Sequence, residues 1–96
     1  LPPLPAALPP GARVTRMVDP PMPIEVELDD ESRPRHIEGM PLVGPVRPVL
    51  RWIVEVDWWS QPVSREYWRV LLLDRLLCEI YRDREADTWF VERVYD

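Results

Sequence analysis

Ten residues decide the fold class of this chain: they read Val49-Leu50-Arg51-Trp52-Ile53-Val54-Glu55-Val56-Asp57-Trp58. From Leu50 to Trp58 every second residue is apolar, and three of the four positions between them are charged. This alternation has the period of a β-strand that buries one face. Ser60-Gln61-Pro62 then interrupts the pattern. We therefore predict a strand over residues 49–58.

A second alternating stretch lies nearer the N-terminus. Residues 24–29 read Ile-Glu-Val-Glu-Leu-Asp, which places the apolar side chains on one face of a strand. The polar run of residues 29–34 predicts a turn, and residues 35–38 predict a short returning strand that ends at Gly39. Pro41, Pro45 and Pro48 favour a loop or an edge segment before the long strand, because proline cannot donate to a strand ladder.

Residues 63–96 contain neither proline nor glycine, and their pattern fits two structures. One is a helix over residues 64–86, which would give an α+β fold, since several apolar residues there fall near one helical face. The other is three strands over residues 67–73, 76–82 and 88–95, with a two-residue turn at Asp74-Arg75 and a longer turn over residues 83–87. β-branched and aromatic residues are dense in the first and last of these segments, which favours strands.

Composition limits the classes of protein that the chain can belong to. Its 96 residues suffice for one domain, its net charge is −5, and it has twelve arginines but no lysine. No catalytic or phosphate-binding lysine is therefore present in it, and the negative charge disfavours a general electrostatic grip on nucleic acid. One cysteine, Cys78, and one histidine, His36, exclude a disulfide framework and an ordinary zinc site. We expect no cofactor or metal and a cytoplasmic location.

The N-terminal part of the chain differs in composition from the rest. Residues 1–23 contain eight of the thirteen prolines, and such segments favour extended conformations without a packed core. We predict a flexible tether over residues 1–22 and a small β domain over residues 23–96.

The spaced aromatic motifs of the C-terminal half resemble a known family. They read Asp57-Trp58-Trp59, Ser64-Arg65-Glu66-Tyr67-Trp68-Arg69-Val70, Tyr81-Arg82-Asp83, Trp89-Phe90-Val91 and Tyr95-Asp96. In combination, over about residues 20–96, they look like a small bacterial β domain of unknown function. That domain occurs at the C-terminus of ImuB-type proteins, which are inactive Y-family polymerase-like subunits of mutasomes, and also as short separate proteins.

The resemblance implies strands rather than a helix, and a setting in DNA damage tolerance. It supplies no catalytic residues. Family members usually have Asp-Gly where this chain has Asp74-Arg75, and often a glycine near Ala86-Asp87. These two hairpin turns are therefore expected to differ from those of the family.

Aromatic and arginine residues are the candidates for a binding surface. Strand phase places Trp52, Trp58 and Trp68 in one core and leaves Trp59 to contact a partner or a base, or to pack beneath the proline-rich segment. The candidate partner-binding or nucleic-acid-binding residues are Trp59, Arg65, Tyr67, Arg69, Tyr81 and Arg82. Alternatively, Arg65 and Arg69 form ordinary cross-strand ion pairs, with Glu66, Glu79, Asp83 or Glu85 as the partners.

No constellation in the sequence indicates catalysis. The acidic residues of the two alternating strands are the product of alternation itself, and Cys78 lies in an apolar run typical of a buried side chain. We therefore expect an all-β fold of five or six antiparallel strands, in a partly open barrel or a strongly curled sheet. The expected function is a noncatalytic module that binds a protein partner of a DNA-repair assembly. Binding of single-stranded DNA and formation of a homodimer are the alternatives kept open.

Overall fold

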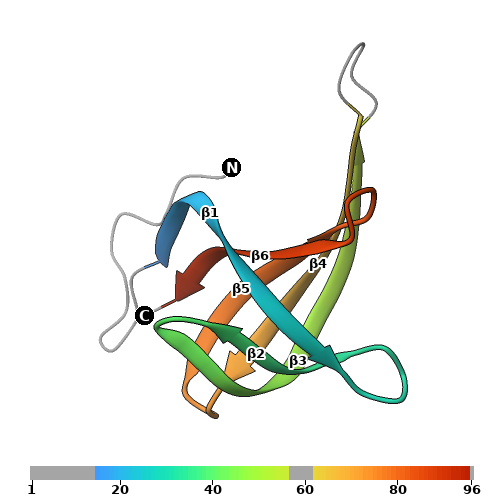
Figure 1. Ribbon diagram of the computed structural model, residues 1–96. Helices are drawn as coiled ribbons and strands as arrows, with labels where there is room; N and C mark the ends of the chain where they lie inside the picture. Colours follow the sequence, from blue (N-terminus) through green and yellow to red (C-terminus); the bar gives the residue numbers. More distant parts are fainter. Residues whose placement is uncertain (1–14, 57–61, 96) are drawn as a thin grey trace.

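The computed structural model describes residues 15–56 and 62–95, and within these ranges the chain forms six β-strands and no helix (Figure 1). The strands are β1 Thr15–Leu28, β2 Pro34–Gly39, β3 Leu42–Val56, β4 Val63–Leu72, β5 Leu76–Asp83 and β6 Thr88–Tyr95. Each strand pairs antiparallel with the next, and β1 pairs with β6, so the sheet curls until its two ends meet. The predicted all-β fold with a curled antiparallel sheet is confirmed, and the alternative helix over residues 64–86 is wrong.

Strand β1 begins at Thr15 rather than at residue 23, where we placed the start of the β domain. Its first residues pair with the end of β6, and the pairing resumes at Met22 after an irregularity that contains Pro20 and Pro21. These prolines lie where the ladder is already interrupted, so their missing N–H groups cost little there. Residues 15–22 therefore belong to the sheet, and the part of the predicted tether over residues 1–14 lies outside the described residues.

Strand β3 is longer than the sequence indicated, because it begins at Leu42 instead of near residue 49. Residues 42–45 pair with β2, and residues from Val46 onward pair with β4. Pro45 and Pro48 are thus part of a strand rather than of a loop. Pro48 lies at a bulge, which is a position where a strand tolerates proline.

The bulge in β3 reverses the phase of the strand. Pro48 lies opposite Val70, but Leu50 already lies opposite Arg69, so Val49 is an extra residue. Val46, before the bulge, belongs to the core, whereas Leu50, after it, is 50% exposed. The prediction that Trp52 enters the core is therefore wrong, because the bulge turns it to the outer face of the sheet. Trp68 does lie in the core, and Trp58 lies outside the described residues.

The hairpin between β4 and β5 turns one residue earlier than predicted. Leu73 and Asp74 both have positive φ angles, of 53° and 55°, and the N–H of Arg75 donates to the carbonyl of Leu72 at 3.1 Å. Two successive left-handed residues closed by such a bond are the marks of a type I′ turn. The turn is therefore centred on Leu73-Asp74, not on Asp74-Arg75.

The core lies inside the curled sheet and draws on all six strands. Ile37, Val70, Cys78, Ile80 and Val91 have no exposed surface. The remaining core side chains are Ile24, Val46, Trp68 and Leu72. In the described ranges, no helix is long and apolar enough to cross a membrane.

Candidate functional site: an arginine and aromatic outer face

Four aromatic rings form a continuous row across the outer face of β3, β4, β5 and β6. Trp52 lies opposite Tyr67, Tyr67 opposite Tyr81, and Tyr81 opposite Phe90. Each neighbouring pair of ring centroids is 5.2 Å apart, and the Trp52 and Tyr67 planes differ by only 5°. The register of three strand pairs thus builds an aromatic row, since directly opposite side chains on one face of a sheet are in contact.

Two arginines from β4 cover this row. The guanidinium of Arg65 lies 4.5 Å from the ring centroid of Tyr81, and that of Arg69 lies 5.6 Å from Trp52 and 5.2 Å from Tyr95. All three distances suit cation–π attraction. We call these residues, together with Tyr67 and Phe90, the outer face.

Two glutamates neutralise the arginines of the outer face. Arg69 pairs with Glu79 at 3.0 Å, and Arg65 lies 3.7 Å from Glu92. Glu79 is only 6% exposed and has Arg93 as a second cation at 3.7 Å. Because a buried carboxylate needs such partners, the arginines have a structural role as well as a surface one.

A tyrosine hydroxyl joins the two charges at one end of this face. The Tyr67 hydroxyl donates to Glu92 at 2.8 Å and accepts a hydrogen bond from Arg65 at 3.3 Å. Burial, reinforced by the hydrogen bond to the Glu92 carboxylate, raises the pKa of Tyr67 to about 12. Burial also raises the pKa of Tyr81, although the Arg65 guanidinium above its ring acts in the opposite direction. Both phenols are therefore held in the neutral form.

Four of the six predicted site residues come together here: Arg65, Tyr67, Arg69 and Tyr81. The predicted pairing of Arg69 with Glu79 is confirmed, whereas Arg65 has Glu92 as its acidic neighbour. Trp59 lies outside the described residues. Trp52 and Phe90 were not predicted as site residues, because alternation alone assigns Trp52 to the core and leaves Phe90 unassigned.

Arg82 does not join the outer face. It lies opposite Glu66 and Trp89, one residue after Tyr81, so its side chain emerges on the other side of the sheet. There it lies 3.4 Å from Glu66, which also binds Arg51 at 2.7 Å. Burial acts to raise the pKa of Glu66, but the two guanidinium groups outweigh it and hold this pKa below its ordinary value.

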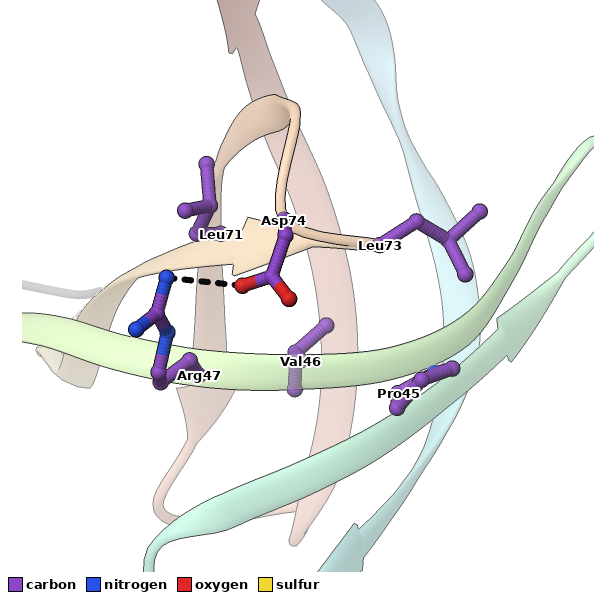
Figure 2. Close-up of a pocket in the computed structure, with 6 residues that line it drawn as sticks. All are labelled: Pro45, Val46, Arg47, Leu71, Leu73 and Asp74. Carbon is purple, nitrogen blue, oxygen red and sulfur yellow. Dashed lines mark ion pairs between the residues drawn. The ribbon is translucent and has the colours of Figure 1, made fainter.

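Two hollows in the surface have few titratable side chains. Figure 2 shows one of about 210 Å³ between β3 and the β4–β5 turn, lined by Pro45, Val46, Arg47, Leu71, Leu73 and Asp74. Its charged groups are Arg47 and Asp74, which pair with each other at 2.7 Å (Figure 2). Another, of about 460 Å³, is mostly apolar and lies among the first half of β1, the starts of β3 and β5 and the end of β6, beside Met17 and Leu42.

The residues most often used in catalysis and metal binding are dispersed. His36 lies on β2, between β1 and β3, whereas Cys78 lies on β5, between β4 and β6. Cys78 has no exposed surface, and burial raises the pKa of its thiol to about 11, so it is a poor nucleophile there. Over the ranges 15–56 and 62–95, no three or more His, Cys, Asp or Glu residues group as metal ligands.

Comparisons of this chain with protein-family models, with curated proteins and with solved structures find no match.

Proposed function

We propose that the chain is a noncatalytic binding module that docks a protein partner through the outer face and the adjoining part of β3. One observation carries this proposal: after the bulge, β3 presents an outward-facing apolar strip beside the arginines of β4. Leu50 is 50% exposed, Val56 is 37% exposed, and Trp52 and Val54 are half-buried. We call these four residues the apolar strip.

The apolar strip has the composition of a protein interface. Tryptophan and arginine are enriched where proteins contact one another, and an apolar centre with a polar rim is the common arrangement. Here Arg69 lies over the Trp52 ring and is itself held by Glu79. A partner therefore meets side chains that are already fixed, and binding orders few additional groups.

Single-stranded DNA is the alternative that the geometry favours less. Bases need open ring faces, but Tyr67 is 8% exposed and Tyr81 is 4% exposed, with Arg65 over the latter. Affinity for phosphates needs uncompensated cations, and both arginines of the outer face have acidic partners. A protein segment with apolar side chains suits this surface better.

The resemblance to the C-terminal domain of ImuB-type proteins supplies the proposed setting, which is bacterial DNA damage tolerance. The partner would then be a subunit of a mutasome. This setting rests on the motifs in the sequence, whereas the docking surface rests on the exposed strip of β3.

The test is a binding measurement with the purified mutasome subunits encoded in the same genome. We expect one of them to bind the full chain, the variant Leu50→Asp to lose at least about tenfold in affinity, and Met40→Asp to bind as the wild type does. Met40 is a suitable control because it is apolar and 81% exposed but lies between β2 and β3, away from the strip. A labelled oligonucleotide is titrated in parallel at two salt concentrations. Steep, salt-dependent DNA binding without binding of any subunit would assign the alternative function instead.

A further inference from the structure

One edge of β3 has no strand beside it in the described part of the chain. Strand β2 pairs with residues 42–45 only, whereas β4 pairs with β3 along the other edge as far as Val56. The edge of β3 beyond the bulge is therefore open, and its side chains are exposed: Val49 is 60% and Ile53 is 43% exposed. An open edge of this length is a template for a further strand.

The hydrogen bonds identify which backbone groups this edge presents. The N–H of Arg84 donates to the carbonyl of Ser64 at 3.0 Å, so the backbone groups of Ser64 point toward β5. Because these groups alternate in direction along an antiparallel strand, those of Arg65 and Tyr67 point toward β3 and bond to their partners Val54 and Trp52. The residues that alternate with those partners along β3 turn their N–H and C=O groups to the open edge: they are Arg51, Ile53 and Glu55.

We propose that a second copy of this chain adds its own β3 to this edge, antiparallel, with Ile53 opposite Ile53 of the second copy. The two chains then form one continuous sheet through a two-fold axis. In this register Arg51 lies opposite Glu55 of the second copy, and Glu55 lies opposite Arg51. The proposal does not depend on the docking function above, since the outer faces stay uncovered.

The side chains of the apolar strip match in the same register. Leu50 lies opposite Val56 of the second copy, and Trp52 lies opposite Val54. Every apolar residue of β3 between positions 50 and 56 thus meets an apolar residue, and both charged residues meet the opposite charge. Opposite charges and apolar pairs that face each other directly stabilise a sheet, whereas like charges destabilise it.

Neighbouring registers lack this match. Moving the axis from Ile53 to Trp52 or to Val54 keeps the same backbone groups on the shared edge, but it places Ile53 opposite a charged residue, Arg51 or Glu55. Moving it further, to Arg51 or Glu55 themselves, places like charges opposite each other. The charge pattern of β3 therefore selects the axis at Ile53.

The charged residues of the edge already form ion pairs within the chain, and these pairs can continue across the proposed interface. Arg51 binds Glu66 at 2.7 Å, and Glu55 binds Arg84 at 2.8 Å. The side chains of Arg51 and Glu55 remain 47% and 65% exposed, so each can take a second partner. Across the proposed interface the charges would alternate from Glu66 through Arg51 to Glu55 and Arg84 of the second copy.

Cysteine cross-linking tests both the association and the register. Residues of a hydrogen-bonded antiparallel pair have Cα atoms about 5.5 Å apart, within the roughly 4.4–6.8 Å range of disulfides. The variant Ile53→Cys should therefore oxidise to a covalent dimer of twice the 11.4 kDa chain mass at low micromolar concentration. The control Val54→Cys should not form a disulfide. Its position lies diagonally across from Val54 of the second copy, with the two Cα atoms about 7–8 Å apart. Native Cys78 is fully buried and does not compete.

Charge exchange provides a second, noncovalent test by sedimentation. In a dimer of either variant, Glu55→Arg or Arg51→Glu, positions 51 and 55 carry like charges and face each other at two places. Each substitution should therefore weaken self-association by about tenfold. An equimolar mixture of the two variants restores both ion pairs and should associate as strongly as the wild type. Circular dichroism confirms that each variant is folded.

The outcomes separate cleanly. Association of the wild type, cross-linking at Ile53→Cys alone and recovery in the mixture support the proposal. The proposal would be overturned if the wild type sediments as a monomer at all concentrations tested and the Ile53→Cys variant forms no cross-linked dimer. Cross-linking of Val54→Cys as fast as Ile53→Cys would overturn the register.

Discussion

Replacing Tyr67 with phenylalanine removes a hydroxyl that joins two charged side chains of the outer face. This hydroxyl donates to Glu92 at 2.8 Å and accepts from Arg65 at 3.3 Å, and the tyrosine is only 8% exposed. A hydrogen bond to a charged group contributes about 1.5–3 kcal/mol. Since Arg65 can still approach Glu92 in the variant, we expect Tyr67→Phe to lower the free energy of unfolding by about 1.5 kcal/mol at pH 7.

The same substitution should change how stability depends on pH. The pKa of Tyr67 is raised from 10.0 to about 12 in the folded chain. Between these values the unfolded chain binds fewer protons at this group than the folded chain does, so the stability contributed by the neutral hydroxyl is complete below pH 10 and is lost as the pH rises toward 12. The phenylalanine variant lacks this titration. The stability difference between the two chains should therefore shrink above pH 10.

Urea unfolding of both chains at pH 7 and at several values between pH 9.5 and pH 11 measures this difference. At pH 7 a loss of 1.5 kcal/mol corresponds to a fall in Tm of roughly 6–12 °C for a domain of this size. The matched control is Glu92→Gln, which keeps an acceptor but removes the charge, and the double variant completes a mutant cycle. A stability difference that stays constant over the whole pH range would refute the assignment of the hydroxyl to the Glu92 carboxylate.

Three further predictions concern the barrel. Ile80→Ala should cost about 3–4 kcal/mol in unfolding free energy because Ile80 is fully buried, whereas Ile53→Ala should cost under about 1 kcal/mol because Ile53 is 43% exposed; equal losses in urea unfolding would contradict the exposure of Ile53. Gly39→Ala should destabilise by about 1–3 kcal/mol, since the added methyl group would meet the Ile24 side chain, and an unchanged melting temperature would show that the strands separate there at no cost. Cys78 should react with a thiol reagent only at the rate of unfolding, because it is buried and its pKa is raised to about 11; rapid labelling of the native chain would indicate an opening of the barrel between β5 and its neighbours.

The sequence, together with the family resemblance, predicted most of the strands but not the phase of β3. Alternation over residues 49–58 located the second half of β3, yet the bulge at Val49 shifts the strand by one residue, and no glycine marks it. Trp52 therefore appeared to belong to the core. A bulge depends on how two strands meet, so alternation within one strand cannot reveal it.

The candidate site was only partly predictable from the sequence. Tyr67 and Tyr81 lie in the uninterrupted β4–β5 ladder, but their direct pairing depends on the turn, because a two-residue turn at Asp74-Arg75 would have placed Tyr67 opposite Arg82. Phe90 and Glu92 depend on a second irregularity, because β6 has one extra residue between the positions opposite Ile80 and Glu79. The first half of β1 was missed for a similar reason: prolines signal extended chain, and only the pairing with β6 makes that segment a strand.

The tolerance of β3 to substitution differs before and after the extra residue at Val49. Before it, side chains such as Val46 must fit a filled interior, where a change of one methylene group is felt. After it, the side chains of Leu50, Trp52, Val54 and Val56 lie on the outer side of the sheet, so substitutions there leave the packing of the interior intact. Substitutions at these positions can therefore change the chemistry of the outer side of this strand while the packing inside the sheet stays the same.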